Sequence, residues 1–259
     1  MTRAGAAAGE AERDGAKELR RMADAVTDEL KGVGITFVGD NEEANFMVAS
    51  AMAKALKYTP LSTPELIERV TGSSRDEIVA EDGEAGLVIA ENAVLEQLST
   101  MLRCCTATSG GGKCATARGA CWDYLFGQFT VWLDDVPSAQ RAAEEEKTRE
   151  GKENNEWTGS MPQREAYEFA DVHLVMSSTT VGTEAEAVGI AGQALGAIKQ
   201  LIEGDPQLPG KKGFYVKMGC RGDWPVLQPP GWDGTKEGMV DPATGKPYRD
   251  AMGPQPAAE

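Results

Sequence analysis

The stretch Gly34-Ile-Thr-Phe-Val-Gly-Asp-Asn-Glu-Glu-Ala-Asn-Phe46 decides the fold. Its apolar first part, residues 34–38, predicts a buried strand, and residues 44–56 predict a helix after a turn at Gly39. A strand, a tight glycine turn and a helix form the setting of the phosphate-binding loop G-x-x-x-x-G-K-[ST]. The turn at residues 39–46 therefore lies where such a loop would cradle the phosphates of a nucleotide.

Three residues of the phosphate-binding motif are replaced in this turn. Gly39 supplies the first glycine of the motif, but Ala44 stands at the second glycine. Asn45 stands at the lysine, and Phe46 stands at the hydroxyl residue that would bind magnesium. Ala44 also adds a Cβ where the motif uses the conformational freedom of glycine.

The turn is acidic where a nucleotide needs positive charge. It carries Asp40, Glu42 and Glu43. Phosphoryl transfer depends almost wholly on positioning and electrostatic stabilisation. Two unit charges about 4 Å apart interact by about 4 kcal/mol at an effective dielectric constant of about 20. Because neutral Asn45 forfeits an attraction of that order, we expect no ATP-dependent kinase activity.

Composition narrows the classes of partner and ligand. The net charge of −15 argues against nucleic acid and against an anionic membrane surface. No apolar run approaches the roughly 20 residues of a membrane helix, so we expect no spanning segment and leave peripheral association open. With one histidine and no C-x-x-C spacing, we expect neither a metal nor a cofactor. The cysteines are expected to be buried and reduced; they are Cys104, Cys105, Cys114, Cys121 and Cys220.

Strands that alternate with amphipathic helices predict a parallel sheet covered on both faces. Capping boxes at Ser74–Glu77 and Thr183–Glu186 each predict a helix start. A charge run at 139–155 predicts a solvated helix that frays into a loop. Strands are expected at 34–38, 102–107, 129–133 and 172–176, and helices at 12–31, 44–57, 64–70, 84–100, 113–126, 162–170 and 183–203.

We expect three parts: an N-terminal helical extension at 1–32, a domain at 33–203 and an extended strap at 204–259. The strap holds nine of the thirteen prolines and shows no helical or strand period. Its aromatic residues are unusual for a disordered tail and predict rings that lie in pockets, either on the same domain or on a partner. For the two tryptophans we favour partner contact. These expected partner-binding residues are Phe214, Tyr215, Trp224, Trp232 and Tyr248.

Several motifs together resemble the shikimate kinase family, specifically its degenerate plant and algal shikimate-kinase-like branch. The resemblance runs from about Gly34 to Glu203 and implies a P-loop-kinase-like three-layer α/β/α fold with a central parallel sheet of five strands. The N-terminal helix and an irregular C-terminal extension flank it. The motifs are Ile35-Thr-Phe-Val-Gly39, Gly83-Glu84 followed by Glu91, Thr108-Ser-Gly-Gly-Gly112, Val131-Trp-Leu-Asp134 with Val136-Pro137, and Arg164-Glu-Ala-Tyr167.

The resemblance also implies an active site, and most of it is absent. Family members transfer the γ-phosphate of ATP to the 3-hydroxyl of shikimate. Their two substrate-site aspartates fall on Ser62 and Pro64, and their substrate-clamping arginine falls on Val88. The lid region, about 141–162, is heavily acidic. A vestigial anion nest is one reading of what remains, with a tight packing turn and a structural ion pair as the alternatives; its residues are Gly110, Gly111, Gly112, Lys113 and Arg164.

These observations predict a catalytically inactive domain that serves as a protein-binding or scaffold subunit. The resemblance implies a chloroplast setting, in the stroma or on the stromal face of the thylakoid, within a larger assembly such as a photosynthetic complex. The alternative is a sensor that binds a shikimate-like or phosphate-bearing molecule without turnover, and a divergent metabolite kinase comes third. Trp122 and Trp132 are expected to be core or interface aromatics, and His173 to pack in or at the edge of its strand.

Overall fold

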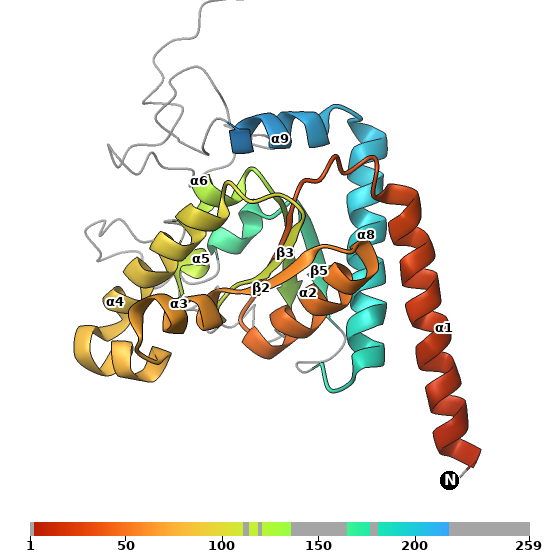
Figure 1. Cartoon of the computed structure of the whole chain (residues 1–259), viewed down its shortest axis with the longest axis horizontal. Helices are drawn as coiled ribbons and strands as arrows, with labels where there is room; N and C mark the ends of the chain where they lie inside the picture. The colour runs from red at the N-terminus through yellow and green to blue at the C-terminus, as the bar shows by residue number, and fades with distance from the viewer. Residues whose placement is uncertain (1–2, 111–113, 119–120, 136–164, 177–180, 218–259) are drawn as a thin grey trace, which may run out of the picture.

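The computed structural model describes residues 3–110, 114–118, 121–135, 165–176 and 181–217, and these form an α/β fold around one parallel sheet (Figure 1). The sheet has five strands in the order β2-β3-β1-β4-β5. All four neighbouring pairs run parallel, with Ile35 opposite Cys105 on one side and Phe129 on the other. The strands are β1 (Ile35–Val38), β2 (Thr59–Ser62), β3 (Cys104–Ala107), β4 (Phe129–Asp134) and β5 (Val172–Val175).

Helices connect the strands and cover both faces of the sheet (Figure 1). Within the described residues, none of them combines the length and the apolarity needed to cross a membrane. They are α1 (Arg3–Val26), α2 (Glu42–Leu56), α3 (Thr63–Thr71), α4 (Arg75–Leu98), α5 (Ala115–Arg118), α6 (Trp122–Leu125), the 3₁₀ helix η1 (Glu165–Phe169), α8 (Glu184–Gly204) and α9 (Leu208–Lys217).

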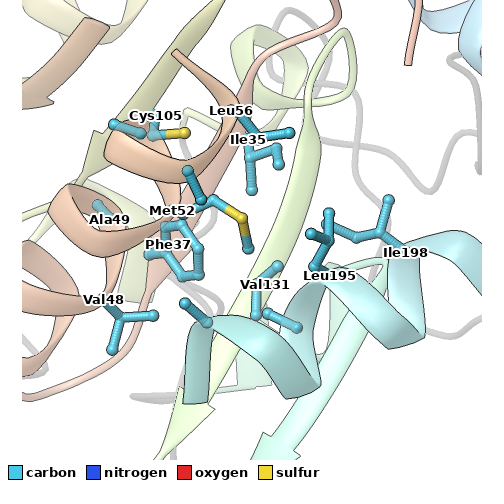
Figure 2. Packing of buried hydrophobic residues seen from close by; sticks show 14 of the residues in the cluster. Ile35, Phe37, Val48, Ala49, Met52, Leu56, Cys105, Val131, Leu195 and Ile198 are labelled. Carbon is cyan, nitrogen blue, oxygen red and sulfur yellow. The ribbon is translucent and has the colours of Figure 1, made fainter. Parts of the chain in front are cut away.

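The larger core lies between one face of the sheet and helices α1, α2 and α8. Figure 2 shows Phe37 and Ile35 of β1 pointing toward Met52 of α2, with Leu195 and Ile198 of α8 beside Val131 of β4. The alternation of side chains along a strand sends every second residue to this face. Helix α1 packs along α8, so the N-terminal extension belongs to the same core (Figure 1).

The opposite face of the sheet holds a second core. Val38 and Trp132 point to this face and pack with residues of α4, α5, α6, η1 and α9. A third, smaller cluster joins α3 to α4 through side chains such as Ile67 and Leu87. Trp122 and Trp132, expected to be core or interface aromatics, are both buried in the second core.

The helix starts were predicted well. Ser74 accepts a hydrogen bond from the Glu77 backbone, and the Glu77 carboxylate accepts one from the Ser74 backbone, which completes the predicted capping box. Gly83 has a non-helical backbone, with φ of 70°, and divides α4 into the two helices that the sequence indicated. Thr183 likewise caps α8 by accepting a hydrogen bond from Glu186 N.

Three predicted helices differ from the structure. The helix expected at 12–31 is α1, which runs from Arg3 to Val26. The single helix expected at 113–126 is instead the pair of short helices α5 and α6, with Gly119, a poor helix former, between them in the sequence. The short helix expected at 162–170 is 3₁₀ over its described part, η1. The charge run at 139–155 lies outside the described residues.

Strand β2 was not located from sequence, and it completes the sheet of five. It is only four residues long, begins with two exposed residues and contains Pro60. Proline cannot donate to a strand ladder and is tolerated at a sheet edge, which is where β2 lies. Its weak pattern follows from that position.

The expectation of irregular structure from Gly204 onward is wrong for residues 208–217, which form α9. Pro209 suits the first turn of a helix because its missing N–H would have no intrahelical partner there. One of the tertiary contacts that hold α9 is made by Lys212, which is buried. Its ammonium donates to the carbonyls of Phe126 (3.2 Å) and Gln128 (3.0 Å) and to the Asp171 carboxylate (3.0 Å).

These partners of Lys212 precede β4 and β5, so α9 closes the amino-terminal end of the sheet. Tyr215 adds to this closure, because its ring is buried and its hydroxyl donates to Asp123 O at 3.1 Å. The start of the predicted strap is therefore an integral part of the domain.

We predict that Lys212→Met lowers the free energy of unfolding by about 3–5 kcal/mol, because it leaves the Asp171 carboxylate without its buried cation. Urea unfolding of the full chain measures the change. The control is Lys211→Met, whose ion pair with Asp205 is exposed and should hardly affect stability. Equal midpoints for the two variants would show that Lys212 does not anchor α9.

Candidate functional site

The turn that follows β1 lies at the carboxyl end of the sheet, where open α/β sheets bind their ligands. It is enclosed by the ends of the two neighbouring strands. A Cβ on Gly39, whose φ is 153°, would lie 2.4 Å from the carbonyl oxygen of Leu133, near the end of β4. A Cβ on Gly110, beyond β3, would lie 2.2 Å from Asp40 O and 2.6 Å from Glu42 N. Both glycines are thus required by close backbone contact across the turn.

Asn45 takes the place of the missing lysine and is directed into the protein. Its side chain is fully buried. The amide Nδ2 donates to the carbonyl of Gly39 at 3.1 Å and to the carbonyl of Thr108 at 3.2 Å. The side chain therefore fastens β1's turn to the end of β3, and its donors are used within the protein.

The first N–H groups of α2 also have internal acceptors. Asn41 caps the helix, and its side chain accepts from Ala44 N at 2.9 Å. The Asn41 carbonyl accepts from Asn45 N at 2.9 Å. In a phosphate-binding loop, backbone N–H groups at the start of the helix point at the anion. Here at least two of these donors are occupied by the turn itself.

An arginine that the sequence did not single out closes the turn from outside. Arg75, the first residue of α4, donates to the Glu42 carboxylate at 2.6 Å and to the Gly110 carbonyl at 2.9 Å. The pair is only partly exposed. A carboxylate from the turn thus receives the positive charge that a bound phosphate would require.

A second polar network lies behind the turn, centred on Glu91 of α4. Glu91 is fully buried. Its carboxylate accepts from Thr63 Oγ1 at 2.9 Å, from Ser109 N at 3.0 Å and from Ala115 N at 2.8 Å. These bonds join the starts of α3 and α5 to the loop after β3. Glu91 therefore acts here as a structural crosslink.

Burial raises the pKa of the Glu91 carboxyl above its ordinary value, while the hydrogen bonds from Ala115, Thr63 and Ser109 oppose that rise. Burial likewise raises the pKa of the Tyr167 hydroxyl, which donates to Asp40 at 3.3 Å. Tyr167 therefore stays neutral near pH 7 and ties η1 to the turn. None of these contacts supplies a cation to an incoming phosphate.

The positions that correspond to catalytic residues in the resembling family have structural roles. Ser62 caps α3 by accepting from Glu65 N at 3.4 Å, and Pro64 lies in the first turn of that helix. Val88 packs against the second core. Phe46, at the place of the magnesium-binding hydroxyl, is half exposed and offers no ligand.

The predicted anion nest is only partly visible. Gly110 is buried, and its carbonyl accepts the hydrogen bond from Arg75. Gly111, Gly112, Lys113 and Arg164 lie outside the described residues. For Gly110 itself, the close packing over the turn fits the alternative of a tight turn.

The expected partner-binding aromatics divide into three groups. Tyr215 was expected to bind a partner, but its ring is buried in the second core of its own domain. Phe214, its neighbour on α9, is half exposed. Trp224, Trp232 and Tyr248 lie outside the described residues.

The described parts of the chain contain no group of three His, Cys, Asp or Glu side chains placed to hold a metal. Burial raises the pKa of the thiols of Cys104, Cys105, Cys114 and Cys121, so these residues are neutral and free. His173 lies on β5, where its Nε2 is 2.7 Å from the Asp134 carboxylate and its ring stacks on Trp132.

A cavity of about 540 Å³ lies by α3 and α4. Its lining includes Ile78, Glu81, Asp82 and Ile89 but no residue of the turn at 39–46. The described cavity is therefore not a nucleotide site inherited from the turn.

Comparisons with known proteins relate the chain to shikimate kinases. A family model described as shikimate kinase matches residues 47–189, and its match begins immediately after the altered turn. The chain is 36% identical over 204 residues to an Arabidopsis thaliana protein named "Probable inactive shikimate kinase like 2, chloroplastic", which covers 79% of this chain and 50% of that protein. It is also 36% identical over 121 residues to a shikimate kinase of Synechococcus elongatus, covering 46% of this chain and 62% of that enzyme.

The chain thus spans about half the length of the plant relative and less than two thirds of the cyanobacterial one. Among solved structures, a shikimate kinase from Acinetobacter baumannii in complex with shikimate aligns with 71% of this chain and 98% of its own. That alignment has a TM-score of 0.48 and 22% sequence identity.

We predict that Asn45→Ala lowers the free energy of unfolding by about 1–3 kcal/mol, because the buried carbonyls of Gly39 and Thr108 lose their donor. Phe46→Ala, which truncates a half-exposed ring at the next position, is the control and should cost less. Urea unfolding measures both. An Asn45→Ala variant as stable as the wild type would contradict the crosslink.

We predict a pH-dependent difference between the wild type and Glu91→Gln. The pKa of Glu91 is raised in the folded state. Its titration therefore adds to the free energy of unfolding fully below the ordinary pKa of 4.5, and this addition is lost as pH rises through the folded pKa. Glutamine cannot titrate, but its amide would oppose Ala115 N and cost about 1–3 kcal/mol. The deficit of the variant should therefore shrink as pH rises above about 4.5. Unfolding free energies across pH 4–8 check this, and a deficit that grows with pH would contradict it.

Proposed function

The chain belongs to the shikimate kinase family, and from that premise we propose that it is a catalytically inactive member that serves as a protein-binding subunit of a larger plastid assembly. The observation that carries the first half of this proposal is the side chain of Asn45. It stands where the family places its phosphate-binding lysine, yet it is buried and donates to two backbone carbonyls.

Electrostatics support the loss of kinase activity. Phosphoryl transfer needs cations and backbone donors around the phosphates. The turn instead carries three carboxylates, and Arg75, which reaches the turn, donates to Glu42 and to the Gly110 carbonyl. A nucleotide would have to displace this pair and meet the remaining negative charge.

The second half of the proposal concerns partners and place. An inactive domain with a net charge of −15 and an extension rich in tryptophan, proline and glycine fits a role in protein binding. The plant relative is named chloroplastic, which supports a plastid location for this chain. Phe214 on α9 and, in the extension at 218–259, Trp224, Trp232 and Tyr248 would contribute to the partner surface.

Ligand titration tests the loss of activity. We expect neither Mg-ATP nor shikimate to raise the melting temperature of the full chain, and no ADP to form above a blank. A ligand present at 100 times its dissociation constant would add about 2.7 kcal/mol of stability. Stabilisation by shikimate or phosphate without turnover would identify the sensor alternative, and ADP formation would identify a divergent kinase.

Truncation tests the scaffold role. Residues 218–259 are the segment to remove, because α9 holds part of the sheet and must be kept. We expect the truncated chain to unfold like the full chain but to lose its association with high-molecular-weight material in plastid extract of the source organism. The matched control is Val70→Ser, an exposed position on α3. Unchanged association after truncation would refute the role of the extension.

A further inference from the structure

Strand β5 forms one edge of the sheet, and among the described residues no strand pairs with its outer side. The opposite edge, β2, carries Pro60, which removes a donor from that edge. Strand β5 reads Val-His-Leu-Val, with neither proline nor lysine to protect it. An unprotected edge is a template for a further strand.

The backbone geometry defines which groups of β5 are available. Met176 N donates to Asp134 O at 2.8 Å, so residue 176 faces β4. In a parallel ladder, alternate residues direct their N–H and C=O to the same neighbouring strand. Leu174 therefore also faces β4, whereas His173 and Val175 direct their backbone groups to the outer edge.

His173 and Val175 also have exposed side chains. Val175 is 67% exposed, and the His173 side chain is 40% exposed. His173 is held by its contact with Asp134 and by stacking on Trp132, with ring centroids 4.1 Å apart. The outer edge therefore combines available backbone groups with an apolar side chain and a fixed ring.

We propose that the outer edge of β5 binds an extended segment of a partner protein by strand addition. In this mode, backbone hydrogen bonds supply affinity and alternate side chains supply selectivity. The inference rests on the proposed protein-binding function and names a surface for it. It adds a site on the folded domain to the C-terminal extension.

Charge favours a different protein over a second copy of this chain. Glu168, on η1 before β5, is exposed, and each chain has a net charge of −15. Pairing two β5 edges would bring two such acidic chains together, and a net charge far from zero opposes the association of like chains. The fitting occupant is a segment that carries aliphatic and basic residues.

Val175→Pro tests the inference, with Val175→Thr as the matched control. Proline removes the outward N–H of residue 175, whereas the bonds to β4 come from residues 174 and 176. Threonine keeps the N–H and suits a strand. We expect the wild type and V175T to co-sediment equally with high-molecular-weight material in plastid extract, and V175P to do so at least tenfold less.

Equal co-sedimentation of V175P and V175T would overturn the strand-addition site and leave the proposed function standing. Failure of the wild type itself to co-sediment would overturn both.

Amide hydrogen exchange tests the edge without a substitution that could disturb folding. In the isolated full chain, the amides of His173 and Val175 should exchange at least a hundredfold faster than that of Leu174. They should slow at least tenfold in the co-sedimenting assembly. Slow outward amides in the dilute isolated chain, or no slowing in the assembly, would overturn the proposal. Protection that grows with concentration of the isolated chain would identify a second copy as the occupant and overturn the choice of partner.

Discussion

The buried amide of Asn45 is the constraint on which the altered site depends. A lysine at this position must leave the protein interior to reach a phosphate, whereas the shorter asparagine turns inward and bonds the carbonyls of Gly39 and Thr108. The turn and the loop after β3 are then held against each other. Gly110 packs directly over the backbone of Asp40 and Glu42.

The remaining polar groups are consistent with this closed arrangement. Glu91 accepts three hydrogen bonds from neighbouring elements, and Arg75 neutralises Glu42 instead of a ligand. At the carboxyl end of the sheet, the donors of Asn45 and Arg75 are therefore bonded within the protein. At the amino end, Lys212 brings α9 into the fold. The features that distinguish this chain therefore lie at both ends of the same sheet.

The sequence predicted the fold class and most elements because strong local signals specify them, such as the apolar run before Gly39 and the caps at Ser74 and Thr183. It did not locate β2, whose exposed residues and proline give no strand pattern. It also missed α9, whose stability comes from the distant partners of Lys212. At the site, the loss of lysine and hydroxyl was evident from the motif. The contacts of Asn45 with Thr108 and of Arg75 with Glu42 and Gly110 were not, because they join residues that lie 33 to 63 positions apart.

The most direct test of the closed turn is the side-chain amide signal of Asn45 in an ¹⁵N-labelled full chain, followed during titration with Mg-ATP. We expect its two amide protons to exchange slowly with water and their chemical shifts to stay unchanged as Mg-ATP is added. Rapid exchange, or a saturable shift with Mg-ATP, would show that Asn45 faces a nucleotide site and would contradict the closed turn.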